Sequence, residues 1–334
     1  VRSCESLYSS PEQLPEASSN LLLRALLMAP SPYGAALVRS LLGVIGRYRV
    51  AGHWALPFSS VLAADTARGV VFLGSQLLLA MLLQPVAAAA DSPKAALHPV
   101  HAYLEEDGAL DDVALSSFLD GLLLALDYGL DARDSLVYGS RGVKLEFEEE
   151  LLILLWHMVC RSPAFCSALA ASTERFRKLL AALVFHLVTS AGEPSLASLA
   201  QMCALTLLQL SLEPEFAAAV NAPCTRRLPL KGAVADALAR GKLADVIVAA
   251  VAQLRSLPGD YPLSLLPAAM SLLSNVSSHV ADYSPVTAQA FVSVVLPVGG
   301  GAGYEPVPPL IARAHLDALA VATLHARTHA RREL

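Results

Sequence analysis

The chain has 334 residues and a formal net charge of −5, and only 16% of its residues are charged, against about a quarter in typical soluble domains. The acidic balance gives no support for nucleic-acid binding, which normally leaves a basic surface. The low charge content predicts that many helix faces pack against other helices. The five cysteines have no CxxC spacing, which favours free thiols in a reduced, cytosolic protein.

The N-terminal part of the chain predicts a helix pair followed by one long helix. Asn20–Ala29 and Ala35–Ile45 form the pair, on either side of a proline-containing turn. Asp65 is expected to cap the long helix, which runs to about Leu83. The Ala-rich segment Pro85–His98 then breaks the pattern and predicts a loop with little protection from hydrogen exchange.

The next helix is predicted from its acidic start. The pair Asp111-Asp112 opens an amphipathic segment that runs to about Leu126, and carboxylates in a first turn favour the positive end of the helix dipole. The following segment, Gly129–Lys144, is polar and rich in turn-forming residues. It is therefore predicted to be a connection.

The segment Leu151–Cys160 is the strongest helix prediction in the chain. Its residues leave little polar face, so we expect the helix to be buried nearly all round. Trp156→Ala is then expected to cost about 3–5 kcal/mol if the ring is buried. The helix is preceded by four glutamates that we interpret as dipole compensation rather than a carboxylate site: Glu146, Glu148, Glu149 and Glu150.

The rest of the chain predicts further helices and no strands. The expected helices are about Thr173–Thr189, Leu196–Leu212, Glu215–Val220, Lys242–Ser256, Pro262–Val280, Pro285–Leu296 and Leu310–Arg327. Val298–Pro309, with four glycines and three prolines, predicts a flexible break that exchanges its amide hydrogens rapidly. The fold class is therefore predicted to be all-α.

Three segments repeat the order apolar helix, short break, proline, second apolar helix. The prolines are Pro163, Pro214 and Pro285; the first two are about fifty residues apart and the third is about seventy further on. Proline fits the first turn of a helix because its missing N–H has no partner there in any case. We expect each proline to begin a helix that packs antiparallel to the one before it. The pattern predicts an α-solenoid of stacked helical hairpins, HEAT/armadillo-like, which is typical of binding scaffolds.

The predicted organisation has four parts. They are a flexible N-terminal segment at residues 1–18, a helical-repeat (solenoid) domain at 19–297, a Gly/Pro linker at 298–309, and a C-terminal helix with a basic tail at 310–334. Since the chain starts at Val1 with a segment rich in Ser, Pro and Glu, we expect a fragment of a longer protein.

Three stretches carry no formal charge over a length that approaches a bilayer span: Gly69–Ala90, Pro194–Leu212 and Tyr261–Ala281. Each is interrupted by polar residues or proline, and none has the flanking aromatic residues of a membrane helix. Buried solenoid helices give the same signal and are favoured. A polytopic membrane protein stays an alternative.

Two histidine pairs have a spacing that metal ligands could use. His98 and His101 are three residues apart, and His325 and His329 are four apart, so each pair could share one helix face. A zinc site needs three or four ligands with a second shell of hydrogen bonds. The pairs therefore do not predict a metal site.

Other apparent motifs have structural explanations. The run Gly299–Gly303 lacks the Lys-Ser/Thr and the preceding strand of a phosphate loop, so it indicates a linker. The glycosylation pattern Asn275-Val276-Ser277 lies inside an apolar helix and is taken as incidental. Asp245 begins an apolar helix and is expected to cap it. We therefore predict no catalytic, cofactor-binding or metal-binding residues and no enzyme.

Several segments together resemble the high-temperature-induced dauer-formation protein family, which is related to dymeclin. They fit in order and approximate spacing over about Ser40 to Val295: Ser40-Leu41-Leu42 through Leu56-Pro57-Phe58, Glu149–Trp156, Phe216 to Leu228-Pro229, Ala244–Val248, Leu272–Ser277 and Ser284–Ala288. The chain departs from the family in its high Ala content. It also has a Gly/Pro loop past Leu296, where family members continue with an aromatic-rich helical stretch.

The resemblance implies a cytosolic, largely helical protein that associates peripherally with Golgi membranes. It implies a non-enzymatic scaffold in vesicle trafficking, protein sorting and secretory granule formation, with protein partners bound along the solenoid surface and no nucleic acid, small-molecule substrate or cofactor. The family's N-terminal start, whose glycine is lipidated in some members, is expected to lie outside this chain. A generic HEAT/armadillo-like adaptor unrelated to the Golgi, for example in nuclear transport, is the other alternative.

Overall fold

Helices and the turns between them make up the part of the chain that the structure describes. It is a computed structural model, and it describes residues 32–48, 59–83, 100, 103–104, 112–134, 145, 147–224, 241–257, 260–280 and 283–295. Within these ranges the only β-type pairing is an isolated bridge between Pro223 and Lys242. The predicted all-α class is confirmed.

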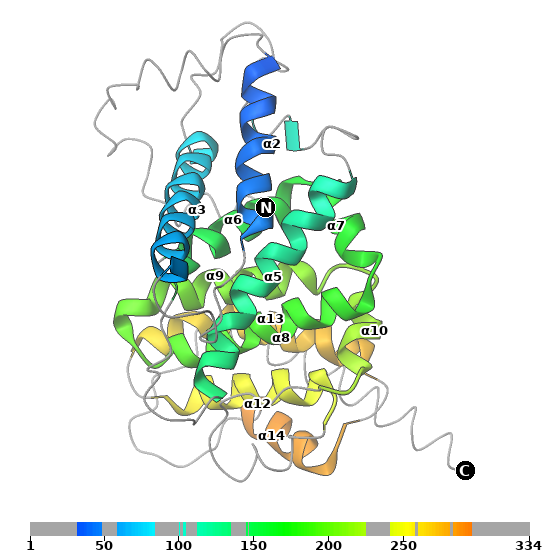
Figure 1. Ribbon diagram of the computed structural model, residues 1–334. Helices are drawn as coiled ribbons and strands as arrows, with labels where there is room; N and C mark the ends of the chain where they lie inside the picture. Colours follow the sequence, from blue (N-terminus) through cyan, green and yellow to red (C-terminus); the bar gives the residue numbers. More distant parts are fainter. Residues whose placement is uncertain are drawn as a thin grey trace, which may run out of the picture.

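The helices are labelled in Figure 1. They are α2 (Pro32–Arg47), α3 (Ser59–Leu83), α5 (Asp112–Asp134), α6 (Glu148–Arg161), α7 (Pro163–Ala170), α8 (Thr173–Ser190), the short 3₁₀ helix η1 (Pro194–Leu196), α9 (Ala197–Leu210), α10 (Phe216–Asn221), α12 (Leu243–Ser256), α13 (Asp260–His279) and α14 (Pro285–Val295). From α6 to α14 the predicted helices agree with these bounds within a few residues. The predictions for 20–29, 85–98, 298–309 and 310–327 lie outside the described residues.

Serine side chains begin three of these helices. Ser162 Oγ accepts the backbone N–H of Phe165 at 3.2 Å, and Pro163 takes the first helical position of α7. Ser172 caps α8 in the same way, and Ser284 Oγ accepts the N–H of Thr287 at 3.1 Å at the start of α14. Each serine satisfies an amide that has no partner within the helix. The predicted helix starts at Pro163 and Pro285 are confirmed.

Two predicted boundaries are wrong. The helix α3 begins at Ser59, so Asp65 lies inside it and does not cap it. The helix α5 continues to Asp134, through part of the predicted connection Gly129–Lys144. A single glycine within a helix costs only about 1 kcal/mol, and the residues after Gly129 include Leu, Ala and Arg, which favour the helix.

The three proline breaks do not form three equivalent antiparallel hairpins. The chain bends by 99° between α6 and α7. Pro214 lies in the turn before α10, which begins at Phe216 and packs on α8 and α13. The helix α14 packs on α12 rather than mainly on α13, which precedes it. Proline at a helix start decides where the helix begins, but the apolar surface of the new helix decides which neighbour it packs against.

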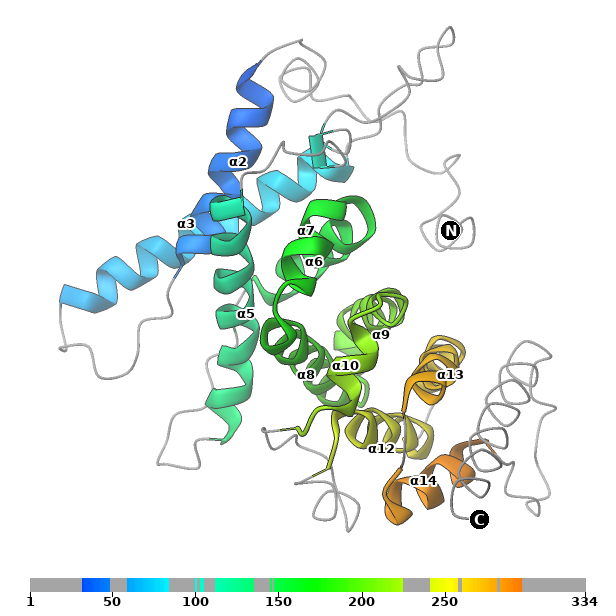
Figure 2. The ribbon, with the colours of Figure 1, turned by 90° about the vertical axis from the view of Figure 1, so that its right-hand side faces the viewer.

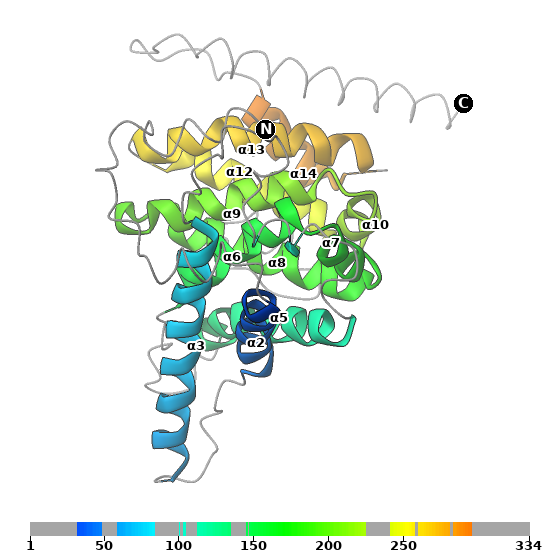
Figure 3. The ribbon, with the colours of Figure 1, turned by 90° about the horizontal axis from the view of Figure 1, so that it is seen from above.

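The helices pack in two rows. One row contains α6, α9 and α13, and the other contains α5, α8 and α12. The pairs α8 with α9 and α12 with α13 pack across the two rows, and Figure 2 shows these pairs nearly end on. At the N-terminal end α2 packs on α5, and α3 packs on α2 and α6. Figure 3 shows that one end of α3 projects beyond the other helices.

The core is continuous along both rows and contains mostly leucine, alanine and valine. Five phenylalanines are fully buried in it: Phe118, Phe147, Phe165, Phe176 and Phe216. Every residue of α8 from Leu179 to Val188 is buried, so this helix is enclosed on all sides. In α6 the apolar residues expected in the core are buried, as predicted: Leu151, Leu152, Leu154, Leu155, Met158 and Val159. Trp156 is only half-buried. The buried ring on which the expected loss of about 3–5 kcal/mol depended is therefore not found.

Trp156→Ala is therefore expected to cost clearly less than a core aromatic substitution. Phe147, at the start of the same helix, is fully buried and packs edge-on against Tyr48 with ring centroids 5.3 Å apart. We expect about 3–5 kcal/mol for Phe147→Ala and a smaller loss for Trp156→Ala. Denaturant unfolding of the two variants measures the difference, and an equal or larger loss for Trp156→Ala would contradict the packing described here.

One helix in the described part of the chain has the length and composition of a membrane span. It is the Thr66–Leu83 part of α3, with a mean hydropathy of 1.6 over 18 residues and 39% of them buried. The other two uncharged stretches fall mainly in α9 and α13, where neighbouring helices cover many of their side chains. Composition alone does not separate such a helix from the core helix of a soluble protein.

Candidate functional site

Two of the proline breaks lie on opposite sides of one hollow. We call it the acidic hollow; its volume is about 780 Å³, and it is lined by Val159, Cys160, Arg161, Ser162, Pro163, Cys166, Ser167, Ala170, Glu213, Pro214 and Glu215. One wall is the corner between α6 and α7, and the other is the turn between α9 and α10. The volume is in the range of ordinary ligand pockets.

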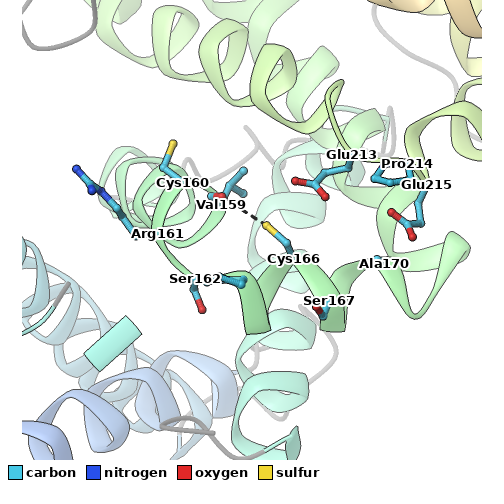
Figure 4. Close-up of a pocket in the computed structure, with 11 residues that line it drawn as sticks. Val159, Cys160, Arg161, Ser162, Cys166, Ser167, Ala170, Glu213, Pro214 and Glu215 are labelled. Carbon is cyan, nitrogen blue, oxygen red and sulfur yellow. Dashed lines mark hydrogen bonds between the residues drawn. The ribbon is translucent and has the colours of Figure 1, made fainter. Parts of the chain in front are cut away.

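Two carboxylates face a thiol across the hollow. Figure 4 shows the side chains of Glu213 and Glu215 directed toward Cys166, while Arg161 points away on the far side. The Cys166 thiol donates a hydrogen bond to the Val159 carbonyl oxygen at 3.4 Å. The hollow therefore presents negative charge and a hydrogen-bonded thiol, a combination that suits a cationic group.

The surroundings of Cys166 hold its thiol in the protonated form. Burial, together with the nearby charge of Glu213 and the neighbouring Cys160, raises the pKa of Cys166 to about 12. A thiol must ionise to act as a nucleophile or metal ligand. Cys166 is thus a partly buried thiol that is protonated at neutral pH.

The cysteines are expected to differ strongly in reactivity. Cys160 is exposed, whereas Cys166 is partly buried with a raised pKa and Cys203 is fully buried, where burial raises its pKa well above the usual value. Of these three thiols, iodoacetamide at mildly alkaline pH should alkylate Cys160 first, as read by peptide mass spectrometry. The variant Cys160→Ser identifies the fast site. Fast labelling of Cys166 would contradict the burial and charge described for the hollow.

Glu148, Glu149 and Glu150 lie in the first turn of α6 and also bind other helices, whereas Glu146 lies outside the described residues. Ser198 Oγ donates to Glu149 at 2.7 Å, and Gln76 Nε2 donates to Glu150 at 3.3 Å. Glu148 is buried and pairs with His186 Nδ1 at 3.0 Å. Dipole compensation predicted their place in the helix. Their partners lie 38 to 74 positions away along the chain and could not be predicted from spacing.

Asp245 is a helix cap, as predicted. Its Oδ2 accepts the backbone N–H of Lys242 at 2.9 Å at the start of α12. Its Oδ1 also accepts the N–H of Ser284 at 3.4 Å, so one buried carboxylate joins the starts of α12 and α14. This second contact had no signal in the sequence.

The remaining candidates have structural partners or lie outside the described residues. Asn275 Nδ2 donates to Ser211 Oγ at 2.7 Å, and Ser277 is buried, so the glycosylation pattern lies within packed α13. Among the residues that the structure describes, no group of three or more His, Cys, Asp or Glu side chains could hold a metal ion. His98, His101, the pair at 325 and 329, and the glycine run at 299–303 lie outside them.

The acidic hollow was not predicted from the sequence, although a signal for it was present. The two breaks that line it have similar sequences, Ser-Pro-Ala-Phe from Ser162 and Glu-Pro-Glu-Phe from Glu213. Phe165 and Phe216 are both fully buried. Each phenylalanine anchors its break in the core, while the proline two residues before it is exposed.

Comparison with known proteins identifies one family. The family model described as high-temperature-induced dauer-formation protein matches residues 1–298. Comparisons with curated proteins and with solved structures gave no match. The match extends beyond both ends of the segments that carried the resemblance in the sequence. Since it covers most of the 334 residues, the chain belongs to the high-temperature-induced dauer-formation protein family.

Proposed function

We propose that this protein is a non-enzymatic scaffold, peripherally attached to Golgi membranes, that acts in vesicle trafficking, protein sorting and secretory granule formation. The observation that carries the proposal is the family match over residues 1–298. In this proposal the full-length protein stays in the cytoplasm or on the cytoplasmic side of the membrane and binds its protein partners along its helical surface.

The proposal includes an α-solenoid architecture. Its support is the packing of α6, α9 and α13 in one row and α5, α8 and α12 in the other, with α8–α9 and α12–α13 paired across the rows. In a solenoid each repeat contacts mainly its neighbours, so stability is shared between adjacent units. The acidic hollow lies at the connections between helices, where repeat proteins commonly present binding residues.

A truncation tests the architecture. Removal of residues 258–334 takes away α13 and α14, and with them most of the packing of α12, but leaves α5, α6, α8 and α9 with most of their contacts. The shortened chain is expected to keep a helical circular dichroism signal and a cooperative melt at a lower midpoint. Loss of all cooperative structure would contradict a nearest-neighbour solenoid.

The cellular role is tested with the full-length protein. It should co-localise with Golgi markers, and alkaline carbonate should release it from membranes because no segment spans the bilayer. A polytopic membrane protein would stay in the carbonate pellet. A generic HEAT/armadillo-like adaptor would show no Golgi enrichment. Either result would contradict the proposal, and the two results are distinguishable from one another.

The 334-residue chain gives a further test of attachment. If its apolar helices are buried against one another, this chain expressed alone should be extractable without detergent. Retention in the membrane after carbonate treatment would identify α3 as a span, because this helix contains the Thr66–Leu83 window.

A further inference from the structure

The exposed side of α3 is apolar. Eight large hydrophobic side chains are exposed among the described residues, and four of them lie on this helix: Val70 (49%), Leu73 (64%), Leu77 (39%) and Leu83 (57%). The opposite side of the same helix is buried against the rest of the protein, with Val71, Leu78 and Met81 in the core. An apolar surface on both sides is typical of a helix that is covered on both sides.

The exposed residues follow the spacing of a helix–helix seam. Val70, Leu73, Leu77 and the exposed Ala80 are separated by three, four and three positions. This is the spacing of the a and d positions that meet a second helix in a coiled coil. We call these four residues and Leu83 the α3 seam. From Gly69 to Leu83 the sequence contains no charged residue.

We propose that the α3 seam is a homodimer interface, in which α3 packs antiparallel against α3 of a second copy of this chain. An uncharged seam is compatible with itself, because two identical copies bring no like charges together along it. The same surface on both copies is what a two-fold axis requires.

The residue order along the seam supports an antiparallel register. With the two-fold axis between Gln76 and Leu77, Val70 faces Leu83 of the partner and Leu73 faces the small Ala80. Leu77 then faces the polar Gln76 next to the axis, Leu73 meets the small Ala80, and two large side chains meet at each end. Gly69 has open space around it, since a Cβ placed there would have no atom within 4 Å. Its surface is therefore available to a partner helix.

The area indicates a weak dimer. The exposed seam side chains form a patch of roughly 300 Å², the size at which apolar patches on soluble proteins begin to mark interaction sites. Two copies that cover the seam bury roughly 600 Å² of these side chains in total, below the about 1,000 Å² that a stable specific interface normally exceeds. The dimer should therefore form in a concentration-dependent way.

A lipid surface is the other occupant that such a helix could meet. Helices that lie in a membrane interface normally carry Lys or Arg on their polar face. The window Thr66–Leu83 contains one basic residue, Arg68. The exposed apolar residues of α3 are instead three or four positions apart, which matches the holes between the side chains of a facing helix. A second copy of the chain is therefore favoured over lipid as the occupant.

Sedimentation velocity of the 334-residue chain over a wide concentration range tests the proposal. The unmodified chain should show a monomer–dimer equilibrium, and Leu73→Ser should weaken it by about tenfold or more, as for loss of about 1.4 kcal/mol. Leu212→Ser is the matched control, since Leu212 lies outside the seam and is 65% exposed, against 64% for Leu73. Both variants should keep the thermal midpoint of the unmodified chain.

Cross-linking tests the register. Gln76→Cys is expected to give a dimer with a short bis-maleimide, because position 76 lies next to the axis. In this register residue 67 of one chain lies about 28 Å along the helix axis from residue 67 of the other, at 1.5 Å rise per residue. Ala67→Cys should therefore add nothing to the background from the native cysteines.

Three results would overturn the proposal. They are a monomer at every concentration, equal weakening of the dimer by Leu73→Ser and Leu212→Ser, and a dimer that Leu73→Ser leaves unchanged. Flotation of the monomer with phosphatidylcholine vesicles, abolished by Leu73→Ser, would assign the seam to lipid instead.

Discussion

Gly121→Ala is expected to destabilise the fold by about 1–3 kcal/mol or more, the usual cost of overpacking a core. A Cβ at position 121 would lie 2.5 Å from the carbonyl oxygen and 2.6 Å from the Cα of Gly46. Both contacts are with backbone, so no side chain can rotate away. The helices α2 and α5 must separate to admit the methyl group.

The same crossing can be tested from the other helix. A Cβ at Gly46 would lie 2.7 Å from the Cα of Phe118, again a backbone atom. Gly46→Ala should therefore be similarly destabilising. The double variant should cost less than the sum of the two, because either methyl group alone already separates the helices.

Gly69→Ala is the matched control for this prediction. Gly69 also lies inside a helix, α3, but a Cβ there would have no atom within 4 Å. Alanine is favoured over glycine in a helix interior by about 0.5–1 kcal/mol, so this variant should be stabilised. Denaturant unfolding followed by circular dichroism compares the three. Equal stability of Gly121→Ala and Gly69→Ala would show that α2 and α5 do not cross at these glycines.

Breaking the buried pair of His186 and Glu148 is expected to cost about 3–5 kcal/mol. His186 Nδ1 lies 3.0 Å from Glu148 Oε1, and Nε2 lies 3.2 Å from the Leu126 carbonyl oxygen. The two side chains are 4% and 11% exposed. The pair and the carbonyl join α8, α6 and α5 within the core.

The hydrogen-bond geometry determines how many protons the two contacts of His186 contain. A carbonyl oxygen can only accept, so Nε2 must carry a proton. The contact between Nδ1 and the carboxyl group then contains one further proton, on either partner. The pair is neutral as a whole when it is complete, and removal of either member leaves a buried polar group without its partner.

A double-mutant cycle tests this account. His186→Leu and Glu148→Leu should each be strongly destabilising, because each removes one side of the Nδ1–Oε1 contact from the core. The double variant should be much closer to the unmodified protein, since apolar pairs of similar size often replace buried ion pairs at little cost. Unfolding free energies give the coupling. Additive losses would mean that the two side chains do not depend on each other.

The ends of most helices could be predicted from the sequence because their signals are local. The helix α8 was predicted at Thr173–Thr189 and is found at Thr173–Ser190. Ser162 with Pro163 marked the start of α7, and Asp245 marked the start of α12. Capping side chains and prolines act within three or four residues, so they can be read without knowledge of the fold. The segments that resemble the family were also present in the sequence, and the family match confirmed them.

Which surfaces meet was decided only by the tertiary structure. The sequence does not indicate that Gly46 lies against Gly121, or that Asp245 reaches Ser284. It also does not indicate that α14 packs on α12, or that the turns before Phe165 and Phe216 line one hollow. An apolar stripe predicts that a helix face will be buried, but many partners could bury it equally well. The choice depends on side-chain shapes, close backbone approaches and buried polar pairs between distant residues, which only the assembled core brings together.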